Sequence, residues 1–290
     1  MRIVVLGSGT SHGIPVVGCD CPVCNSGDTR DKRMRASVYI EGAGGERALI
    51  DAGPEFRLQA IKAGINRLDG IFLTHAHADH IHGLDDVRPL SWNNPLPIYG
   101  NEPTIKEMRE RFSYIWSETQ VGGGKPRLTP QVVSAFEPVK TGTLVFTPVP
   151  VKHGILDIFG WEVLENTSSS NPEAAGHSFL YLTDVSNIPP AVCEQFKKGS
   201  IGQYRIIIIG GLRMRPHETH FSFGEAIEAA LGLGAEEIYI THICHDYFNE
   251  EIEEFCRNFR ETRHISAEIH PAWDGLELIL KRESTIPLAE

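Results

Sequence analysis

The sequence lacks any hydrophobic run long enough to cross a membrane and any segment that resembles a secretion signal. No apolar stretch approaches the roughly 20 residues that span a bilayer. The first seven residues read as a strand, without the basic region, apolar core and cleavage site of a signal peptide. We therefore expect no membrane partner and a cytoplasmic location.

Basic charge is also scarce, because 27 Lys and Arg residues stand against 38 Asp and Glu residues, for a formal net charge of −11. This balance argues against a broad basic face, so extended nucleic acid is not an expected partner. The main basic cluster spans residues 28–35, and we interpret it as a solvated loop in preference to a contact with a substrate phosphate. No role is assigned to Arg33 or Arg35.

The chain shows no low-complexity tail, no shift in composition between its halves and no short internal repeat. Its 290 residues, 41% of them hydrophobic, suffice for one large domain or two small ones. We favour a single domain over residues 1–290 and leave a homodimer open.

Short apolar runs predict a strand-rich fold with interspersed helices. Strands are predicted at residues 2–6, 37–41, 47–50, 70–73, 96–99, 143–149, 179–183, 205–209, 236–240 and 276–280. Helices are predicted at residues 103–116, 222–233 and 248–259. Two glycine-rich or polar segments, residues 117–126 and 166–173, read as loops, of which the first is the better lid candidate. This periodicity alone gives only an α/β or α+β class.

The most informative motif follows the short apolar run at residues 70–74. It places His75, His77, Asp79 and His80 within six residues. A loop leaving a strand can direct the first two side chains to one ion and the last two to a second. Imidazole and carboxylate groups suit zinc, iron or manganese. A chance cluster of histidines on a solvated loop is the weaker alternative, given four ligands so close to a strand end.

Three later strand-like runs each end in one further nitrogen or oxygen ligand, namely His153, Asp184 and His242. We assign His153 to the ion of the first pair and His242 to the ion of the second, with Asp184 bridging both. Two ions about 3.5–4 Å apart stabilise the attacking and leaving oxygens and lower the pKa of a bridging water. The chain is therefore predicted to be a dinuclear hydrolase that uses manganese or zinc, with Asp79 contributing to nucleophile activation. Asp51, which ends the strand at 47–50, is a candidate hydrogen-bond partner of a ligand histidine, and His82 is read as a neighbour of the ligands.

The ordered ligand set resembles the metallo-β-lactamase superfamily over nearly the whole chain. Within it, residues 7–15 and 18–24 resemble the phosphodiesterases of the carbon–phosphorus lyase pathway, which act on a phosphoribosyl cyclic phosphate. The resemblance implies an α+β fold, a four-layered αββα sandwich with the metal site at one edge between two sheets.

A second metal site is indicated by the cysteines. Cys19, Cys21 and Cys24 are spaced too tightly for a disulfide ladder but suit three thiolates on one tetrahedral zinc. The resemblance implies His245 as the fourth ligand of a structural zinc, with Cys244 as the local competitor. Reduced, unliganded thiols are the alternative, and closely spaced thiols fit a reducing compartment.

The resemblance also places a histidine at the start of the helix predicted at 222–233, and His220 matches it. We expect His220 to act as general acid or to stabilise the phosphate, with His217 the weaker candidate. The alternative for either ring is a contact with the first turn of the helix. For Arg213 and Arg215, a contact with an anionic substrate and an ion pair within the protein are equally consistent with the sequence.

The expected substrate is a small cyclic phosphate or nucleotide-like diester. A tRNase Z-type endoribonuclease is the enzymatic alternative, although its RNA-clamping arm has no counterpart in this sequence. A thioesterase of the glyoxalase II type is disfavoured by the cysteine loop. A non-catalytic nucleotide-binding protein on the same fold also stays open.

Overall fold

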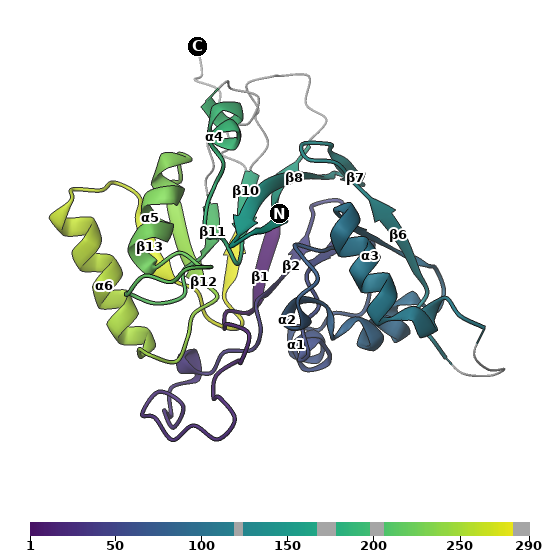
Figure 1. Ribbon diagram of the computed structural model, residues 1–290, viewed down its shortest axis with the longest axis horizontal. Helices are drawn as coiled ribbons and strands as arrows, with labels where there is room; N and C mark the ends of the chain where they lie inside the picture. Colours follow the sequence, from purple (N-terminus) through teal and green to yellow (C-terminus); the bar gives the residue numbers. More distant parts are fainter. Residues whose placement is uncertain (119–123, 167–177, 198–205, 281–290) are drawn as a thin grey trace, which may run out of the picture.

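The computed structural model describes residues 1–118, 124–166, 178–197 and 206–280. Within them the chain forms two seven-stranded sheets that face each other (Figure 1). The first sheet has the order β14-β1-β2-β3-β4-β5-β6 and the second the order β13-β12-β11-β10-β9-β8-β7. Each sheet joins antiparallel strands at one end to parallel strands at the other, β3 to β6 in the first and β10 to β13 in the second.

The strands of the first sheet are β1 (Arg2–Gly7), β2 (Ser37–Glu41), β3 (Arg47–Ile50), β4 (Gly70–Phe72), β5 (Leu96–Gly100), β6 (Leu128–Val132) and β14 (Glu277–Ile279). Those of the second are β7 (Val139–Thr141), β8 (Leu144–His153), β9 (Leu156–Glu165), β10 (Ser178–Leu182), β11 (Ile206–Gly210), β12 (Glu237–Thr241) and β13 (Glu268–Pro271).

The α-helices are α1 (Phe56–Ala63), α2 (Ala78–Ile81), α3 (Glu102–Arg111), α4 (Pro190–Lys197), α5 (Phe223–Gly232) and α6 (Asn249–Thr262). In the same described ranges, 3₁₀ helices lie at Thr29–Asp31, Leu84–Ser91 and Ser113–Ile115. Helices α1 to α3 lie outside the first sheet and α5 and α6 outside the second (Figure 1). None of the helices in the described ranges is long and apolar enough to cross a membrane.

Buried apolar side chains fill the three spaces between the four layers of the fold. One cluster lies between the two sheets, and one lies between each sheet and its outer helices. The alternation of a strand explains them: in β4, Phe72 points into the core between the sheets, whereas Ile71 packs against the helices outside. Strand β11 does the same, with Ile206 and Ile208 facing the central core and Ile207 and Ile209 facing α5. Because both faces are buried, the strand is a continuous apolar run. The predicted αββα sandwich is confirmed.

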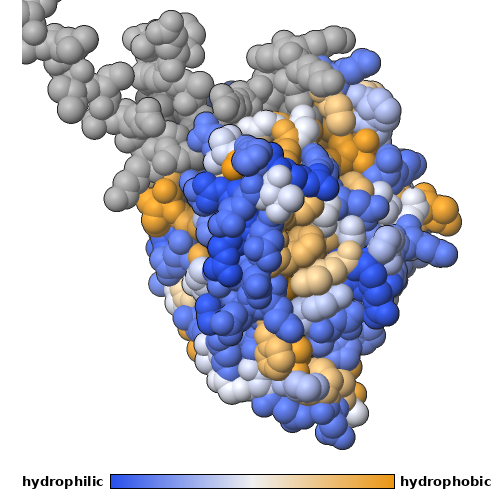
Figure 2. All heavy atoms as spheres, turned by 90° about the vertical axis from the view of Figure 1, so that its left-hand side faces the viewer, coloured by the Kyte–Doolittle hydropathy of each residue, from blue (hydrophilic) through white to orange (hydrophobic). Residues whose placement is uncertain are grey.

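The outer helices have one apolar and one polar face. In α6, Ile252 and Cys256 are buried while charged residues cover the outer side. The molecular face that carries α6 is mostly hydrophilic, interrupted by small apolar patches (Figure 2). In α5, Ser222 caps the first turn and forms a reciprocal capping box with Glu225, which fixes where the helix begins.

All ten predicted strands and all three predicted helices are present, but several elements have no clear sequence pattern. Strands β6, β7, β9 and β13 and helices α1, α2 and α4 were not predicted. Strand β9 buries Glu162 and Glu165 and carries Gly160 at its centre, so its pattern is not that of an apolar strand. Of the two predicted loops, residues 119–123 and 167–173 lie outside the described part of the chain.

Candidate metal centre

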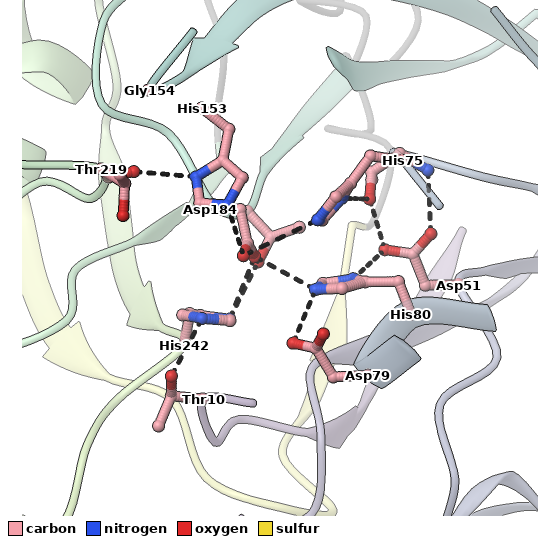
Figure 3. A network of polar contacts seen from close by, with 12 residues as sticks. Thr10, Asp51, His75, Asp79, His80, His153, Gly154, Asp184, Thr219 and His242 are labelled. Atoms are coloured by element: carbon pink, nitrogen blue, oxygen red, sulfur yellow. Dashed lines mark hydrogen bonds and ion pairs between the residues drawn. The ribbon is translucent and has the colours of Figure 1, made fainter. Parts of the chain in front are cut away.

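The seven predicted metal ligands meet at one edge of the two sheets, where strand ends converge. Figure 3 labels all of them except His77. The structure groups His75, His77 and His153 in one set and Asp79, His80, Asp184 and His242 in another, with the donor atoms of each set within 4.8 Å of one another. The sequence analysis predicted the same grouping of the six other ligands, with Asp184 bridging the two sets. Strand β8 ends at His153, while Asp184 and His242 each follow a strand by one or two residues.

Backbone geometry turns two of these ligands sharply toward the site. Asp184 has a φ of 54° and His242 a φ of 58°, the left-handed region that residues other than glycine rarely adopt. Such strained residues persist where the surrounding structure fixes them, often at functional sites. The short helix α2 supplies Asp79 and His80 to the second set, with His77 at its N-cap in an extended conformation.

Asp184 lies between the two sets. Its Oδ1 is 3.2 Å from Nε2 of His80 and 3.0 Å from Nδ1 of His242, both in the second set. Its Oδ2 is 3.9 Å from Nε2 of His75 and 3.9 Å from Nε2 of His153, both in the first. One carboxylate oxygen therefore faces each set, which is the arrangement that a bridging ligand requires.

Hydrogen bonds on the far side of the rings fix three ligand histidines. Nδ1 of His80 donates to the Asp51 carboxylate at 2.7 Å, as the sequence predicted. Asp51 also accepts the Thr74 hydroxyl at 2.7 Å, so the Thr74 oxygen is left to accept from Nδ1 of His75 at 3.0 Å. Nδ1 of His153 donates to the backbone carbonyl of Thr219 at 2.8 Å. In each case Nε2 is left to bind an ion.

The electrostatics of the site suit cations. Burial raises the pKa of Asp184, but His242 and His80 more than compensate and hold it well below its usual value. Burial, with the neighbouring His80, lowers the pKa of His75. Nε2 of His75 and Nε2 of His80 are buried without a well-formed hydrogen bond to any described residue. Two orphaned imidazole nitrogens beside ionised carboxylates fit divalent metal ions.

His220 reaches the centre from the loop before α5. Its ring centroid is 4.7 Å from that of His153 and 4.9 Å from that of His242, and the side chain is half-buried. Burial, with the nearby His242, lowers the pKa of His220 to about 3. A ring nitrogen of His220 also lies within 4.8 Å of a ring nitrogen of His153 and of a carboxylate oxygen of Asp184, so the geometry alone permits His220 to bind an ion.

The neighbouring polar residues lie farther from the centre. His217 is exposed and accepts a hydrogen bond from the backbone of Thr219. Arg215 forms an ion pair with Asp246 at 3.0 Å, and Arg213 donates to the Pro216 carbonyl. His82 is exposed beside Phe112, away from both ligand sets.

The cysteine cluster forms a separate four-residue site. The Sγ atoms of Cys19, Cys21 and Cys24 lie 3.4, 3.5 and 3.5 Å from Nδ1 of His245. Cys244 is not part of this group, so the geometry favours the histidine over its competitor. Backbone N–H groups of Val16 and Cys24 donate to Sγ of Cys24 and of Cys21, which suits thiolate ligands.

The expectation of a solvated loop at residues 28–35 is wrong for Arg33. Its side chain is only 2% exposed and donates to Ser8 Oγ at 2.8 Å, to the Ala272 carbonyl and to Asn249 Oδ1 at 2.9 Å. These bonds satisfy the buried guanidinium, so Arg33 is not available to a substrate. Arg35, in contrast, is partly exposed and forms an ion pair with Glu55.

One contact at the centre has no counterpart in the sequence analysis. The Thr10 hydroxyl lies 3.1 Å from Nε2 of His242 (Figure 3). Thr10 belongs to the glycine-rich opening segment of the chain, whose composition signals a tight loop and not a metal site.

Comparison with known proteins agrees with this geometry. Residues 46–243 match the model of the β-lactamase superfamily domain, a range that includes all seven ligands. The crystal structure of a diphosphatase from the PhnP family is 37% identical, with a TM-score of 0.79, over 97% of this chain and 98% of that chain. Zinc-bound PqqB from Methylobacterium extorquens has the same fold at 16% identity, with a TM-score of 0.73, over 97% of this chain and 100% of that chain.

An octanoyltransferase of Porphyromonas gingivalis is 35% identical over 282 residues. The match covers 97% of this chain but 52% of the octanoyltransferase, so the chain spans about half the length of that relative. The name octanoyltransferase therefore refers to a longer protein, and about half of that protein is not matched by this chain. The superfamily match, in contrast, contains the complete ligand set. The chain belongs to the β-lactamase superfamily, and its seven candidate ligands lie in two adjacent sets that suit a dinuclear metal site.

Proposed function

We propose that this protein hydrolyses small phosphodiesters, either a cyclic phosphate or a nucleotide-like diester. The position of Asp184, with one oxygen toward each ligand set, is the observation that carries the proposal. Two divalent ions, manganese or zinc, would activate a water and stabilise the phosphoryl charge when bound between these sets. Asp79, whose pKa stays below its usual value despite burial because His80 lies beside it, would enter the reaction ionised.

His220 is the residue best placed to act on the phosphate. Because its pKa is low in the free protein, it would meet the substrate as a neutral imidazole and donate a hydrogen bond from its ring N–H. An incoming phosphate anion raises that pKa, which would allow His220 to protonate the leaving oxygen as well. Both roles stabilise charge that develops as the P–O bond breaks.

A second candidate reaction is hydrolysis of a diphosphate. The 37% identity to the PhnP-family diphosphatase over nearly the whole chain supports it. A phosphodiester and a diphosphate present the same phosphoryl centre and differ in whether an alkoxide or a phosphate leaves. A phosphate leaves more readily, so a diphosphate would depend less on protonation by His220.

We further propose that Cys19, Cys21, Cys24 and His245 hold one structural zinc. Four donors around a common point support a closed tetrahedral site without an open position for substrate. The reduced cluster also supports a cytoplasmic location.

The proposal is tested by turnover of bis(p-nitrophenyl) phosphate before and after chelation, with Asp184→Asn as the matched variant. Activity that disappears on chelation and returns with manganese or zinc is expected for the wild type only. A panel of cyclic ribose phosphates, cyclic nucleotides, nucleoside diphosphate esters and precursor tRNA then separates the substrate classes. Cleavage of precursor tRNA alone would support the tRNase Z-type reading. Binding of nucleotides without turnover of any panel member would support the non-catalytic one.

A further inference from the structure

A partly exposed arginine, Arg35, lies beside the metal centre. It precedes β2, which begins where β1 and β3 end. A side chain at Gly53 would collide with the Asp79 carbonyl and come within 3.0 Å of Cβ of Arg35, so these two residues pack together across the glycine. Burial lowers the pKa of the Arg35 guanidinium, and the Asp79 carboxylate opposes this shift, so the two charges interact. Arg35 therefore lies next to the second ligand set.

A turn of the opening segment holds the guanidinium from the other side. Nε of Arg35 donates to the carbonyl of Ser11 at 3.0 Å. The N–H of Gly13 donates to the Thr10 carbonyl at 2.9 Å, which closes the turn, and a side chain at Gly13 would come within 3.2 Å of Nη1 of Arg35. The Thr10 hydroxyl of this turn contacts His242 (Figure 3). Both segments that hold Arg35 thus reach the second ligand set.

The Arg35 side chain keeps hydrogen-bond donors to spare. Nε is taken by Ser11 and Nη1 pairs with Glu55, but Nη2 has no hydrogen-bond partner among the described residues. The side chain is 25% exposed, so solvent reaches it. Ser11 and His12 are exposed on the same turn, and a hydroxyl and an imidazole N–H are further donors to an anion.

An anion bound at Arg35 would lie beside the metal ions and not between them. Arg35 is no member of either ligand set, and it meets Asp79 on the backbone side of that residue. The scissile phosphate, in contrast, must reach the ions themselves. The position of Arg35 therefore suits a part of the substrate that does not react.

We propose that Arg35 and the exposed turn at residues 11–12 form a subsite for a second anionic group of the substrate, a phosphate monoester on the same molecule as the scissile diester. The inference rests on the proposed function, because it requires a diester at the metal centre. A guanidinium binds phosphate oxygens through two parallel N–H groups, which provides orientation as well as affinity. The site should therefore favour a phosphorylated diester over the same diester without that phosphate.

The ion pair with Glu55 distinguishes this role from a structural one. If Arg35 served only to tie the turn to Glu55, loss of either partner would have the same effect. In a subsite the Glu55 carboxylate repels the incoming phosphate. Glu55→Gln, which keeps the shape of the side chain, should therefore retain or raise the affinity for the phosphate, whereas Arg35→Gln should lower it.

Arg30 provides a matched control within the same basic cluster. It pairs with Asp28 at 2.8 Å and with Glu253 at 3.8 Å, and all three side chains are exposed. Arg30→Gln therefore removes the same charge from the cluster without removing a bond to the turn at residues 10–13.

The experiment compares two chromogenic diesters, the p-nitrophenyl ester of thymidine 5′-phosphate and the same ester with an added 3′-phosphate. For the metal-loaded wild type we expect kcat/KM to be about 10- to 100-fold higher for the phosphorylated ester, through KM, because a hydrogen bond to a charged group contributes about that factor. Arg35→Gln should lose this preference, Glu55→Gln should retain or increase it, and Arg30→Gln should match the wild type.

A wild type without the preference, an equal preference in Arg35→Gln, or an equal loss in Arg35→Gln and Glu55→Gln would overturn the subsite. If Arg35→Gln does not fold, calorimetry decides with the wild type and Glu55→Gln. Thymidine 3′,5′-bisphosphate should bind more tightly than thymidine 5′-phosphate to both proteins, and weaker binding in Glu55→Gln would overturn the subsite. Turnover of neither ester by the wild type would instead reject the proposed function, and the same calorimetric comparison would still test the subsite.

Discussion

Oδ2 of Asp51 lies 2.7 Å from Nδ1 of His80, and neither side chain is exposed to solvent. Asp51 accepts three hydrogen bonds from this ring and from Thr74, whose hydroxyl in turn contacts His75. One buried carboxylate therefore orients a histidine of each ligand set. Its left-handed φ of 60° fixes the carboxylate at the end of β3.

Asp51→Asn is expected to weaken metal binding without removing a ligand. In the variant, the NH₂ group of the amide must replace one of the carboxylate oxygens that now accept hydrogen bonds from Thr74 and His80. An NH₂ group cannot accept, so at least one of these hydrogen bonds is lost. Metal affinity should fall by about 10- to 100-fold, and activity should recover with excess Mn²⁺. Metal titration measures this directly. Asp157→Asn is the control, because Asp157 is exposed and forms a surface ion pair with Lys152. Equal affinities in the two variants would contradict the role of Asp51.

His220→Ala should retain both ions and the fold while kcat falls by roughly 10²–10⁴, the usual contribution of a positioned acid or base. The deficit should shrink for a substrate with a good leaving group such as p-nitrophenolate, which needs little protonation. Metal analysis and kcat on paired diesters provide the measurement.

The exposed neighbour His217 offers a matched control, since His217→Ala removes an imidazole outside the centre. Loss of an ion from His220→Ala would show that His220 is a ligand. Unchanged kcat on a poor leaving group, with both ions present, would show that it has no part in the reaction.

Cys21→Ser should release zinc and lower the melting temperature, because a structural zinc contributes folding free energy. Cys193→Ser is the comparison, since Cys193 lies on α4 apart from the cluster. We expect zinc content to fall by one ion per chain in the first variant and to stay unchanged in the second. Equal zinc content and equal melting temperatures would reject the site.

Arg33→Ala should destabilise the protein by about 1–3 kcal/mol for each buried acceptor that loses its donor, because Arg33 now donates to Ser8 Oγ, the Ala272 carbonyl and Asn249 Oδ1. Arg215→Ala removes a largely exposed pair with Asp246 and should cost less than about 1 kcal/mol. Urea unfolding of both variants tests the contrast. Similar costs for the two would mean that the Arg33 network does not contribute to stability.

The ligands were predictable because each strand end that reaches the centre carries a histidine or aspartate close to an apolar run. Their supporting partners were mostly not predictable. Thr10 lies 232 residues from His242 in the chain, and the partner of His153 is a backbone carbonyl, which any residue at position 219 would supply. Arg33 was predicted to be solvated because its neighbours in the sequence are charged. In the structure Arg30 forms an exposed ion pair with Asp28, whereas the Arg33 side chain is buried.

The most direct test of the dinuclear site is anomalous diffraction from metal-replete crystals, with metal analysis of the wild type and of Asp184→Asn. We predict two adjacent ions in the wild type, one beside His75, His77 and His153 and one beside Asp79, His80 and His242, with Asp184 between them. Asp184→Asn should hold at most one ion tightly. A single ion in the wild type, with Asp184 turned away from it, would contradict the account.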